Sequence, residues 1–137
     1  MKAPRLRLRT LLVIVTVLAV VLTAVKYVSD WDFQLKSEYS AARVISDTTK
    51  FVESRKGRWP ADWSDIPGGI DASKYVSMRF DVTADELAAN PESIYEAIQP
   101  KSGEYRTYPH AEEQLDNLRQ SVLRFRASPP PDANSNH

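Results

Sequence analysis

The chain has 137 residues and no cysteine, and its 18 Lys plus Arg balance 18 Asp plus Glu. This length suffices for one small domain and one membrane span, and the lack of cysteine excludes a disulfide framework, cysteine-ligated metal centres and a thiol nucleophile. The charges are segregated, because residues 1–9 contain four cations and no acid whereas residues 27–137 contain 13 cations and 18 acids. An acidic body disfavours nucleic acid as a partner.

Residues 1–9 form a basic N-terminus that precedes a long apolar run. Residues 11–25 contain no charged side chain, and continuing past Lys26 to Val28 gives eighteen residues, about 27 Å of helix, which is enough to cross a thin bilayer. The sequence therefore predicts a transmembrane helix over residues 10–28, with the lipid bilayer as its first partner. Because cations concentrate on the cytoplasmic side of membrane spans, the N-terminus is expected in the cytoplasm and the body of the chain outside it.

A cleaved signal peptide shares these features, so two interpretations stand. Signal peptidase prefers small residues at positions −3 and −1 from the cut. Ala19 and Ala24 fit the second position, but Val17 and Leu22 stand at the first. The favoured interpretation is an uncleaved single-pass anchor in a bacterial cytoplasmic (inner) membrane, and a secreted domain is the alternative. Both place the body of the chain outside the cytoplasm.

The helix is expected to continue beyond the membrane, because residues 28–55 contain no Gly or Pro and carry an apolar stripe. Gly57 and Pro60 then end it. Two arrangements fit the pattern: one long helix, or a second helix that starts at a cap near Asp30. In either arrangement, five residues of the stripe are candidates for lateral association with the same chain or a related membrane protein: Trp31, Leu35, Tyr39, Ala42 and Ile45.

Four features follow one another along the chain: a basic tip, an uninterrupted hydrophobic helix, its amphipathic continuation and a Gly-x-Trp-Pro loop. The loop lies within residues 49–66, TKFVESRKGRWPADWSDI. This order resembles the plan of type IV pilins and pseudopilins over roughly residues 10–70. The resemblance implies that the helix leads through such a loop into a sheet. The prepilin-peptidase motif is absent, since no Gly precedes Gly57 and no acid precedes Asp30. The chain otherwise resembles short bacterial single-pass membrane proteins.

The end of this helix and the loop after it each permit two interpretations. Three cations at the helix end either offset the helix dipole, which is the simpler interpretation, or contact a polyanion: Arg55, Lys56 and Arg58. In the loop, Trp59 and Trp63 either present a stacking platform to a glycan or peptide, or fold back over the helix end. The second interpretation is favoured, and it predicts that Trp59 and Ile66 are buried.

The segment that follows alternates in polarity and then changes to a helical pattern. Residues 75–82, YVSMRFDV, alternate strictly and predict one strand of a small antiparallel sheet. Thr83 and Glu86 have the spacing of a capping box, which opens a short helix to Ala89. Asn90 and Pro91 are expected to start another short helix, which runs to Ile98.

The C-terminal third is predicted to complete the sheet and add a last helix. Residues 104–108, EYRTY, are a plausible second strand. Residues 111–126 carry an apolar stripe with acids in the first turn and arginines late, which is typical of an amphipathic helix. Residues 127–137 are rich in Pro, Ser and Asn, which predicts a disordered tail.

Residues with catalytic or metal-binding chemistry are sparse. His110 and His137 are the only histidines, and they are too isolated in sequence for metal-ligand spacing. The sequence therefore predicts no catalytic residue, no metal ligand and no cofactor. It predicts an α+β fold in which a small antiparallel sheet and short helices pack on the C-terminal half of the long helix, with residues 29–126 as a small extracytoplasmic domain. The expected function is non-enzymatic assembly or scaffolding in the cell envelope.

Overall fold

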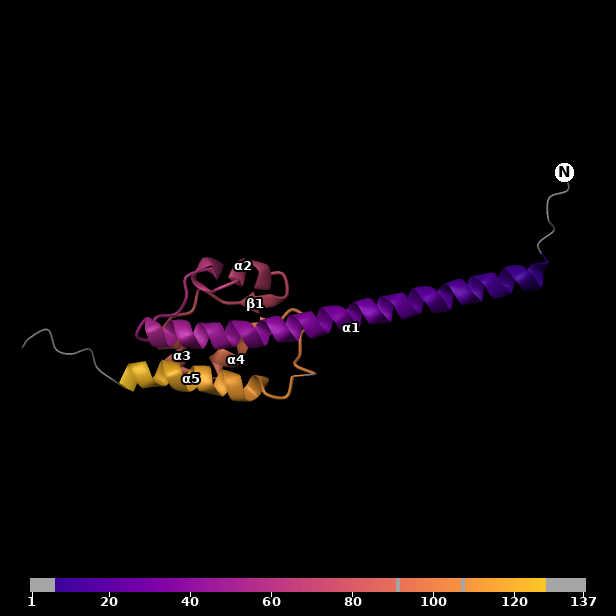
Figure 1. Ribbon diagram of the computed structural model, residues 1–137. Helices are drawn as coiled ribbons and strands as arrows, with labels where there is room; N and C mark the ends of the chain where they lie inside the picture. The colour runs from indigo at the N-terminus through magenta and orange to yellow at the C-terminus, as the bar shows by residue number, and fades with distance from the viewer. Residues whose placement is uncertain (1–6, 91, 107, 128–137) are drawn as a thin grey trace, which may run out of the picture. The chain divides into compact units, whose positions relative to one another are not determined.

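The computed structural model describes residues 7–90, 92–106 and 108–127. It has the predicted mixed α+β fold and is mostly helical (Figure 1). The chain forms two compact units, Met1–Phe33 and Gln34–His137. In chain order the elements are α1 (Leu8–Ser54), a 3-10 turn η1 (Trp63–Asp65), α2 (Gly69–Ala72), β1 (Val76–Met78), α3 (Ala84–Ala89), α4 (Ser93–Ala97), β2 (Ile98–Pro100) and α5 (Ala111–Ala127).

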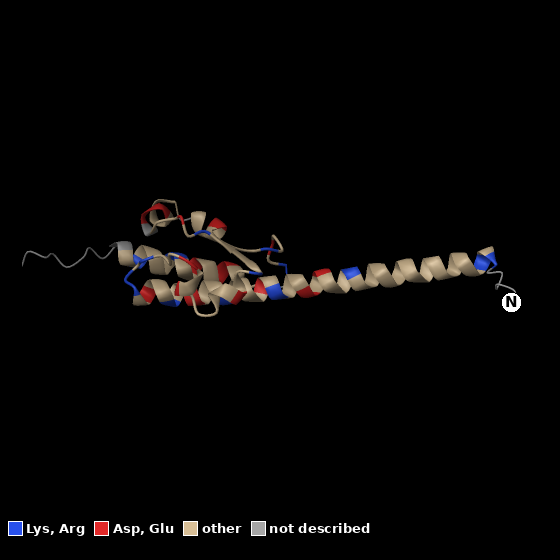
Figure 2. Cartoon of the chain, turned by 90° about the horizontal axis from the view of Figure 1, so that it is seen from above, with Lys and Arg blue, Asp and Glu red and all other residues tan. Residues whose placement is uncertain are grey.

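The first unit consists of the N-terminal part of α1. Between Arg9 and Lys26 this helix carries no charged side chain (Figure 2). Its apolar side chains are exposed on every side, and an 18-residue window within it is long and apolar enough to cross a membrane, with none of that window buried. A signal sequence would have the same character. The helical assignment runs unbroken through residues 29–32, so the alternative with a new helix near Asp30 is not what the structure shows.

In the second unit, α1 and α5 lie side by side and run in the same direction (Figure 1). The Ser121 hydroxyl on α5 donates a hydrogen bond of 2.9 Å to the Glu53 carboxylate on α1. One turn further along, Gly57 faces Phe125. Between the helices, α5 buries Leu115, Leu118 and Val122 against a core to which α1 contributes Ala41, Val44, Ile45 and Val52. The predicted last helix is thus confirmed over Ala111–Ala127.

The sheet has two antiparallel strands, but its second strand is not the one predicted. Strand β1 pairs with β2 in the register Val76 to Pro100 and Met78 to Ile98. Residues 104–106 form no strand, so the predicted strand over 104–108 is wrong; position 107 lies outside the described residues. The alternation in the first strand is real and continues beyond β1, because Val76 and Val82 are buried whereas the intervening odd-numbered residues are exposed: Ser77, Arg79 and Asp81.

The short helices follow their local signals closely. Thr83 and Glu86 form both hydrogen bonds of a capping box at the start of α3, which ends at Ala89 as predicted. Helix α4 begins later than expected, at Ser93, and ends at Ala97, because Ile98 already belongs to β2. The predicted helix start at Pro91 and the predicted tail beyond residue 127 lie outside the described residues.

The C-terminus of α1 is closed by two consecutive residues in the left-handed region. Lys56 has φ of 55° and Gly57 has φ of 85°. The Gly57 N–H donates to the Val52 carbonyl at 2.8 Å, which is the six-to-one hydrogen bond of a Schellman motif. A Cβ on Gly57 would stand 2.7 Å from the Cβ of Phe125, so glycine is needed both for the turn and for the approach of α5.

Substituting this glycine should therefore destabilise the second unit more than a substitution that only strains the backbone. Gly103 is the matched control, because its φ is 98° but a Cβ added there would meet nothing within 4 Å. We expect Gly103→Ala to cost about 1 kcal/mol of unfolding free energy and Gly57→Ala at least about 2 kcal/mol. Denaturant unfolding of the full chain in neutral detergent, followed by tryptophan fluorescence, measures both. Equal losses for the two variants would contradict the close approach of α5.

Candidate interaction surfaces

Some residues of the predicted association stripe on α1 are exposed and others are buried. Trp31, in the first unit, is 47% exposed. In the second unit Leu35 and Tyr39 are 42% and 71% exposed, whereas Ala42 and Ile45 are 6% and 0% exposed. The two buried residues belong to the interior of the domain. Leu35 and Tyr39 are therefore the members of the stripe on this unit that present their side chains to the outside.

Tyr39 stands between two shallow grooves of the second unit. One groove, of about 130 Å³, lies towards α2 and is lined in part by Pro67 and Ala72. The other, of about 370 Å³, lies towards α5 and is lined in part by Tyr108 and Gln114. An exposed aromatic ring flanked by two depressions has the geometry of an interface anchor, because tyrosine contributes large contact area with few rotatable bonds.

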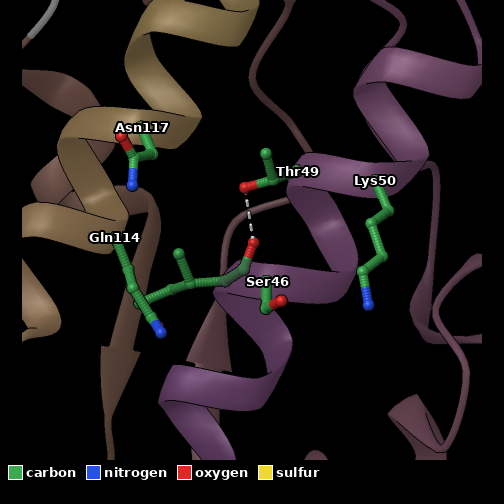
Figure 3. A pocket seen from close by; sticks show the side chains of 6 residues that line it. Ser46, Thr49, Lys50, Gln114 and Asn117 are labelled. Atoms are coloured by element: carbon green, nitrogen blue, oxygen red, sulfur yellow. Dashed lines mark hydrogen bonds between the residues drawn. The ribbon is translucent and has the colours of Figure 1, made fainter.

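A further groove of about 240 Å³ continues along the α1–α5 junction (Figure 3). Its side chains carry hydroxyl, amide and ammonium groups over an apolar base formed by Ile45, and they are Ser46, Thr49, Lys50, Gln114 and Asn117. The Thr49 hydroxyl is already engaged, since it donates to the Ile45 carbonyl at 2.8 Å. Such a site offers polar contacts to a partner.

Charges along this face of α1 are largely paired with one another. The Asp47 carboxylate lies 3.7 Å from the Arg43 guanidinium and 3.9 Å from the Lys50 ammonium. Because Arg43 and Lys50 are mostly exposed, these ion pairs add little to stability. The single Asp47 carboxylate offsets only one of the two positive charges, so these three residues keep a net charge of about +1.

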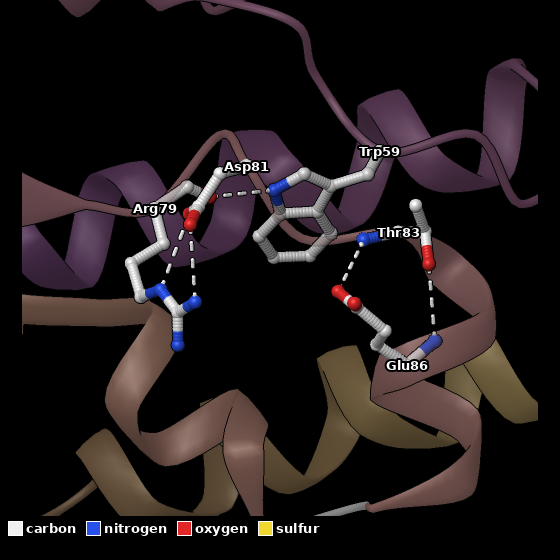
Figure 4. A network of polar contacts seen from close by, with 5 residues as sticks. All are labelled: Trp59, Arg79, Asp81, Thr83 and Glu86. Atoms are coloured by element: carbon white, nitrogen blue, oxygen red, sulfur yellow. Dashed lines mark hydrogen bonds and ion pairs between the residues drawn. The ribbon is translucent and has the colours of Figure 1, made fainter.

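The Trp59–Trp63 loop is part of the core rather than a free aromatic platform. Trp59 is 6% exposed, and its indole N–H donates to the Arg79 carbonyl at 2.9 Å (Figure 4). Ile66 is 2% exposed, so the predicted burial of both residues is confirmed. Trp63 is half-buried and meets Phe80 edge to face, with ring centroids 5.2 Å apart. A contact between Trp63 and a ligand stays a prediction. The ring of Trp59 has no exposed face on which a ligand could stack.

The two acids of this loop, Asp62 and Asp65, stabilise its turns through hydrogen bonds. The Asp62 carboxylate accepts hydrogen bonds from the hydroxyl and the N–H of Ser64, which lower the pKa of Asp62. The Asp65 carboxylate accepts the N–H of Ala61 at 2.8 Å. Both acids are exposed and occupied by backbone donors, so they cap the loop.

The principal polar centre of the domain is Glu38, which sequence reasoning did not identify. Its side chain is 1% exposed. The carboxylate accepts the backbone N–H of Arg106 at 2.9 Å and of Tyr108 at 3.0 Å, and also the amide N–H of Gln34 at 3.0 Å. Next to it, the Ser37 hydroxyl donates to the Tyr75 carbonyl at 2.6 Å and accepts the N–H of Ser102 at 3.1 Å.

These contacts explain why residues 104–106 form no strand. A buried carboxylate is costly unless its oxygens are hydrogen-bonded, and here they take the backbone donors that a sheet would otherwise use. A sequence signal was present, because Glu38 lies four residues before Ala42 and seven before Ile45, on the buried face of the helix.

Tyr105 lies in the segment that Glu38 holds. Burial, and after it the negative charge of Glu38, raise the pKa of the Tyr105 phenol. The folded state thus favours the neutral phenol, and this contribution to stability is complete below the ordinary tyrosine pKa of about 10 and declines as the pH rises beyond it. Within the described part of the chain the phenol oxygen is buried without a hydrogen-bond partner.

Among the described residues no group of three or more His, Cys, Asp or Glu is placed to hold a metal ion. His110 is largely exposed, and its Nδ1 lies 3.5 Å from the Glu113 carboxylate. No family model, curated protein or solved structure matches the chain. The resemblance to type IV pilins therefore stays an expectation from the sequence.

Removing the charge of Glu38 tests its role. Glu38→Gln replaces one acceptor oxygen by an NH₂ group that faces a backbone N–H, so we expect a loss of about 1–3 kcal/mol of unfolding free energy. Glu113→Gln, at a largely exposed helix position, is the control and should change stability by less than about 0.5 kcal/mol. Denaturant unfolding of the full chain in neutral detergent measures both. A Glu38→Gln variant as stable as the wild type would show that the carboxylate does not hold residues 106 and 108.

Proposed function

We propose that this chain is a single-pass membrane protein that carries a small extracytoplasmic domain for non-enzymatic assembly or scaffolding in a bacterial cell envelope. The observation that carries the proposal is the uncharged part of α1, whose apolar side chains are exposed on all sides. Leaving that surface in water would be unfavourable at about 25 cal/mol per Å², and a bilayer removes the cost.

The orientation follows from the charges at the two ends of the apolar run. Arg7 and Arg9 precede it, and the first acids of the chain, Asp30 and Asp32, come after it. This asymmetry supports a cytoplasmic N-terminus in the inner membrane. A cleaved signal sequence would deliver the same domain in secreted form, so the fate of the N-terminus separates the two possibilities.

Intact-mass spectrometry of the chain expressed in a bacterium decides between them. We expect the membrane fraction to contain the chain with residues 1–28 still attached, and the protein to resist extraction by carbonate and high salt. As a control, a variant with Leu22→Ala, which supplies a small residue at position −3 before Ala24, should be cut more readily if the segment is handled by signal peptidase. A mature protein that begins at residue 20 or 25 would contradict the anchor.

The assembly role rests on Leu35 and Tyr39, the exposed members of the stripe in the second unit. Two copies anchored in one membrane are held at high local concentration, so a modest apolar contact suffices for association. Ile45 was also a candidate, but it is 0% exposed and belongs to the core. Truncating it would cost about 2–5 kcal/mol of stability and would not report on association.

Disulfide crosslinking in membranes tests this role, because the chain has no cysteine and Ser40→Cys supplies a single thiol beside Tyr39. We expect Leu35→Ala and Tyr39→Ala each to reduce the crosslinked dimer severalfold, since each removes exposed contact area. Ile70→Ala is the matched control, because Ile70 is as exposed as Tyr39, at 71%, and lies on α2. Equal dimer yields in all three variants would refute the role of the stripe.

A further inference from the structure

We propose that the end of the second unit where α1 and α5 terminate is a binding site for a linear polyanion, a chain that carries repeated phosphate or carboxylate groups. The site, here called the basic end patch, consists of Arg55, Lys56, Arg58 and Arg124. The first three follow α1 directly, and Arg124 lies in the last turn of α5. This ligand class rests on the proposed extracytoplasmic location of the domain, where such polymers are envelope components.

The parallel course of the two helices is what brings these residues together. Glu53 and Ser121 are joined by a hydrogen bond, and a Cβ on Gly57 would touch Phe125. Lys56 and Arg58 flank Gly57, and Arg124 precedes Phe125. Residues almost 70 positions apart in the chain are thus brought to the same end of the domain, whereas an antiparallel helix pair would have placed them at opposite ends.

Six cations elsewhere on the domain have acidic partners, and among the described residues the cations of this patch have none. Arg43, Lys50, Lys74, Arg79, Arg106 and Arg119 each lie within 4 Å of an Asp carboxylate or of Glu104. Within the part of the chain that the structure describes, no Asp or Glu comes that close to any of the four patch residues, and all four are exposed. The Arg55 guanidinium lies 5.8 Å from the centre of the Phe51 ring.

Offsetting the helix dipoles does not account for this amount of charge. A helix C-terminus carries a partial charge equivalent to about −0.5, so the two adjacent ends sum to about −1. Four cations against that sum and the nearby Glu53 carboxylate leave an excess of about two positive charges, although residues 27–137 carry five more acids than cations. A local excess of this sign on an acidic domain is a surface on which an anion gains Coulomb energy.

The exposure of the four side chains favours a polymer over a small anion. They stand on the outside of two helix ends, which suits contacts with successive charges along a flexible chain. Each such contact releases a counterion, so affinity should fall steeply with salt. Duplex nucleic acid is disfavoured because its stiff backbone cannot bend away from the acidic remainder of the domain, whereas a flexible chain can.

Binding of inorganic polyphosphate to the purified full chain in neutral detergent tests the site. We expect binding at low salt, with log K falling against log salt with a slope of about −2 to −3, as three or four contacts to a single-stranded polyanion give. The triple variant Arg55→Gln, Arg58→Gln, Arg124→Gln should bind at least tenfold more weakly and flatten the slope to about −1 or less. Lys56 is kept, because its backbone closes the Schellman motif.

The matched control removes three cations that have acidic partners. Lys74→Gln, Arg79→Gln and Arg106→Gln change the net charge by the same amount, and together they should leave the affinity within about twofold of the wild type. Circular dichroism of both triple variants verifies that they fold. Equal losses in the two variants, no polyphosphate binding at low salt, or tighter binding to single-stranded DNA or to anionic vesicles than to polyphosphate would overturn the proposal. These outcomes are independent of where the chain resides in the cell.

Discussion

The buried carboxylate of Glu38 is the interaction on which the arrangement of the domain depends. Taking a charged group out of water costs several kcal/mol, and the cost is recovered only if the oxygens are supplied with good donors. The segment after β2 provides them through the N–H groups of Arg106 and Tyr108, and Ser37 engages both Tyr75 and Ser102. Two adjacent residues of α1 thereby fix the end of the sheet and the approach to α5.

The direction of α5 follows from this attachment and has a consequence for charge. Because the backbone N–H groups of residues 106 and 108 are held at Glu38, the chain enters α5 beside the C-terminal part of α1. Helix α5 then runs in the same direction as α1. The two helix C-termini then lie together at Gly57 and Phe125. Two parallel helix dipoles side by side are electrostatically unfavourable, because their negative C-terminal ends repel each other. The surrounding cations offset this repulsion and leave an excess of positive charge. The packing that closes the core therefore also creates the basic end patch.

Much of the local structure could be predicted from the sequence, because its signals act over a few residues. The capping box at Thr83 and Glu86, the alternation around Val76 and the burial of Trp59 all follow from such patterns. The strand expected over residues 104–108 failed because its backbone donors are captured by a side chain 68 and 70 positions away, which no local pattern encodes. Helical periodicity likewise identified the stripe on α1. It cannot show at which residue of the stripe the rest of the domain begins to bury it.

Amide hydrogen exchange of the full chain in neutral detergent tests the role of Glu38 and Ser37 most directly. If these side chains hold the segment, the amides of Ser102, Arg106 and Tyr108 should exchange as slowly as those of Arg79 and Lys101, which donate to backbone carbonyls of the opposite strand segments at 2.9 Å and 2.8 Å. Exchange of the three amides at the rate of freely solvated loop residues, while Arg79 and Lys101 stay protected, would contradict it.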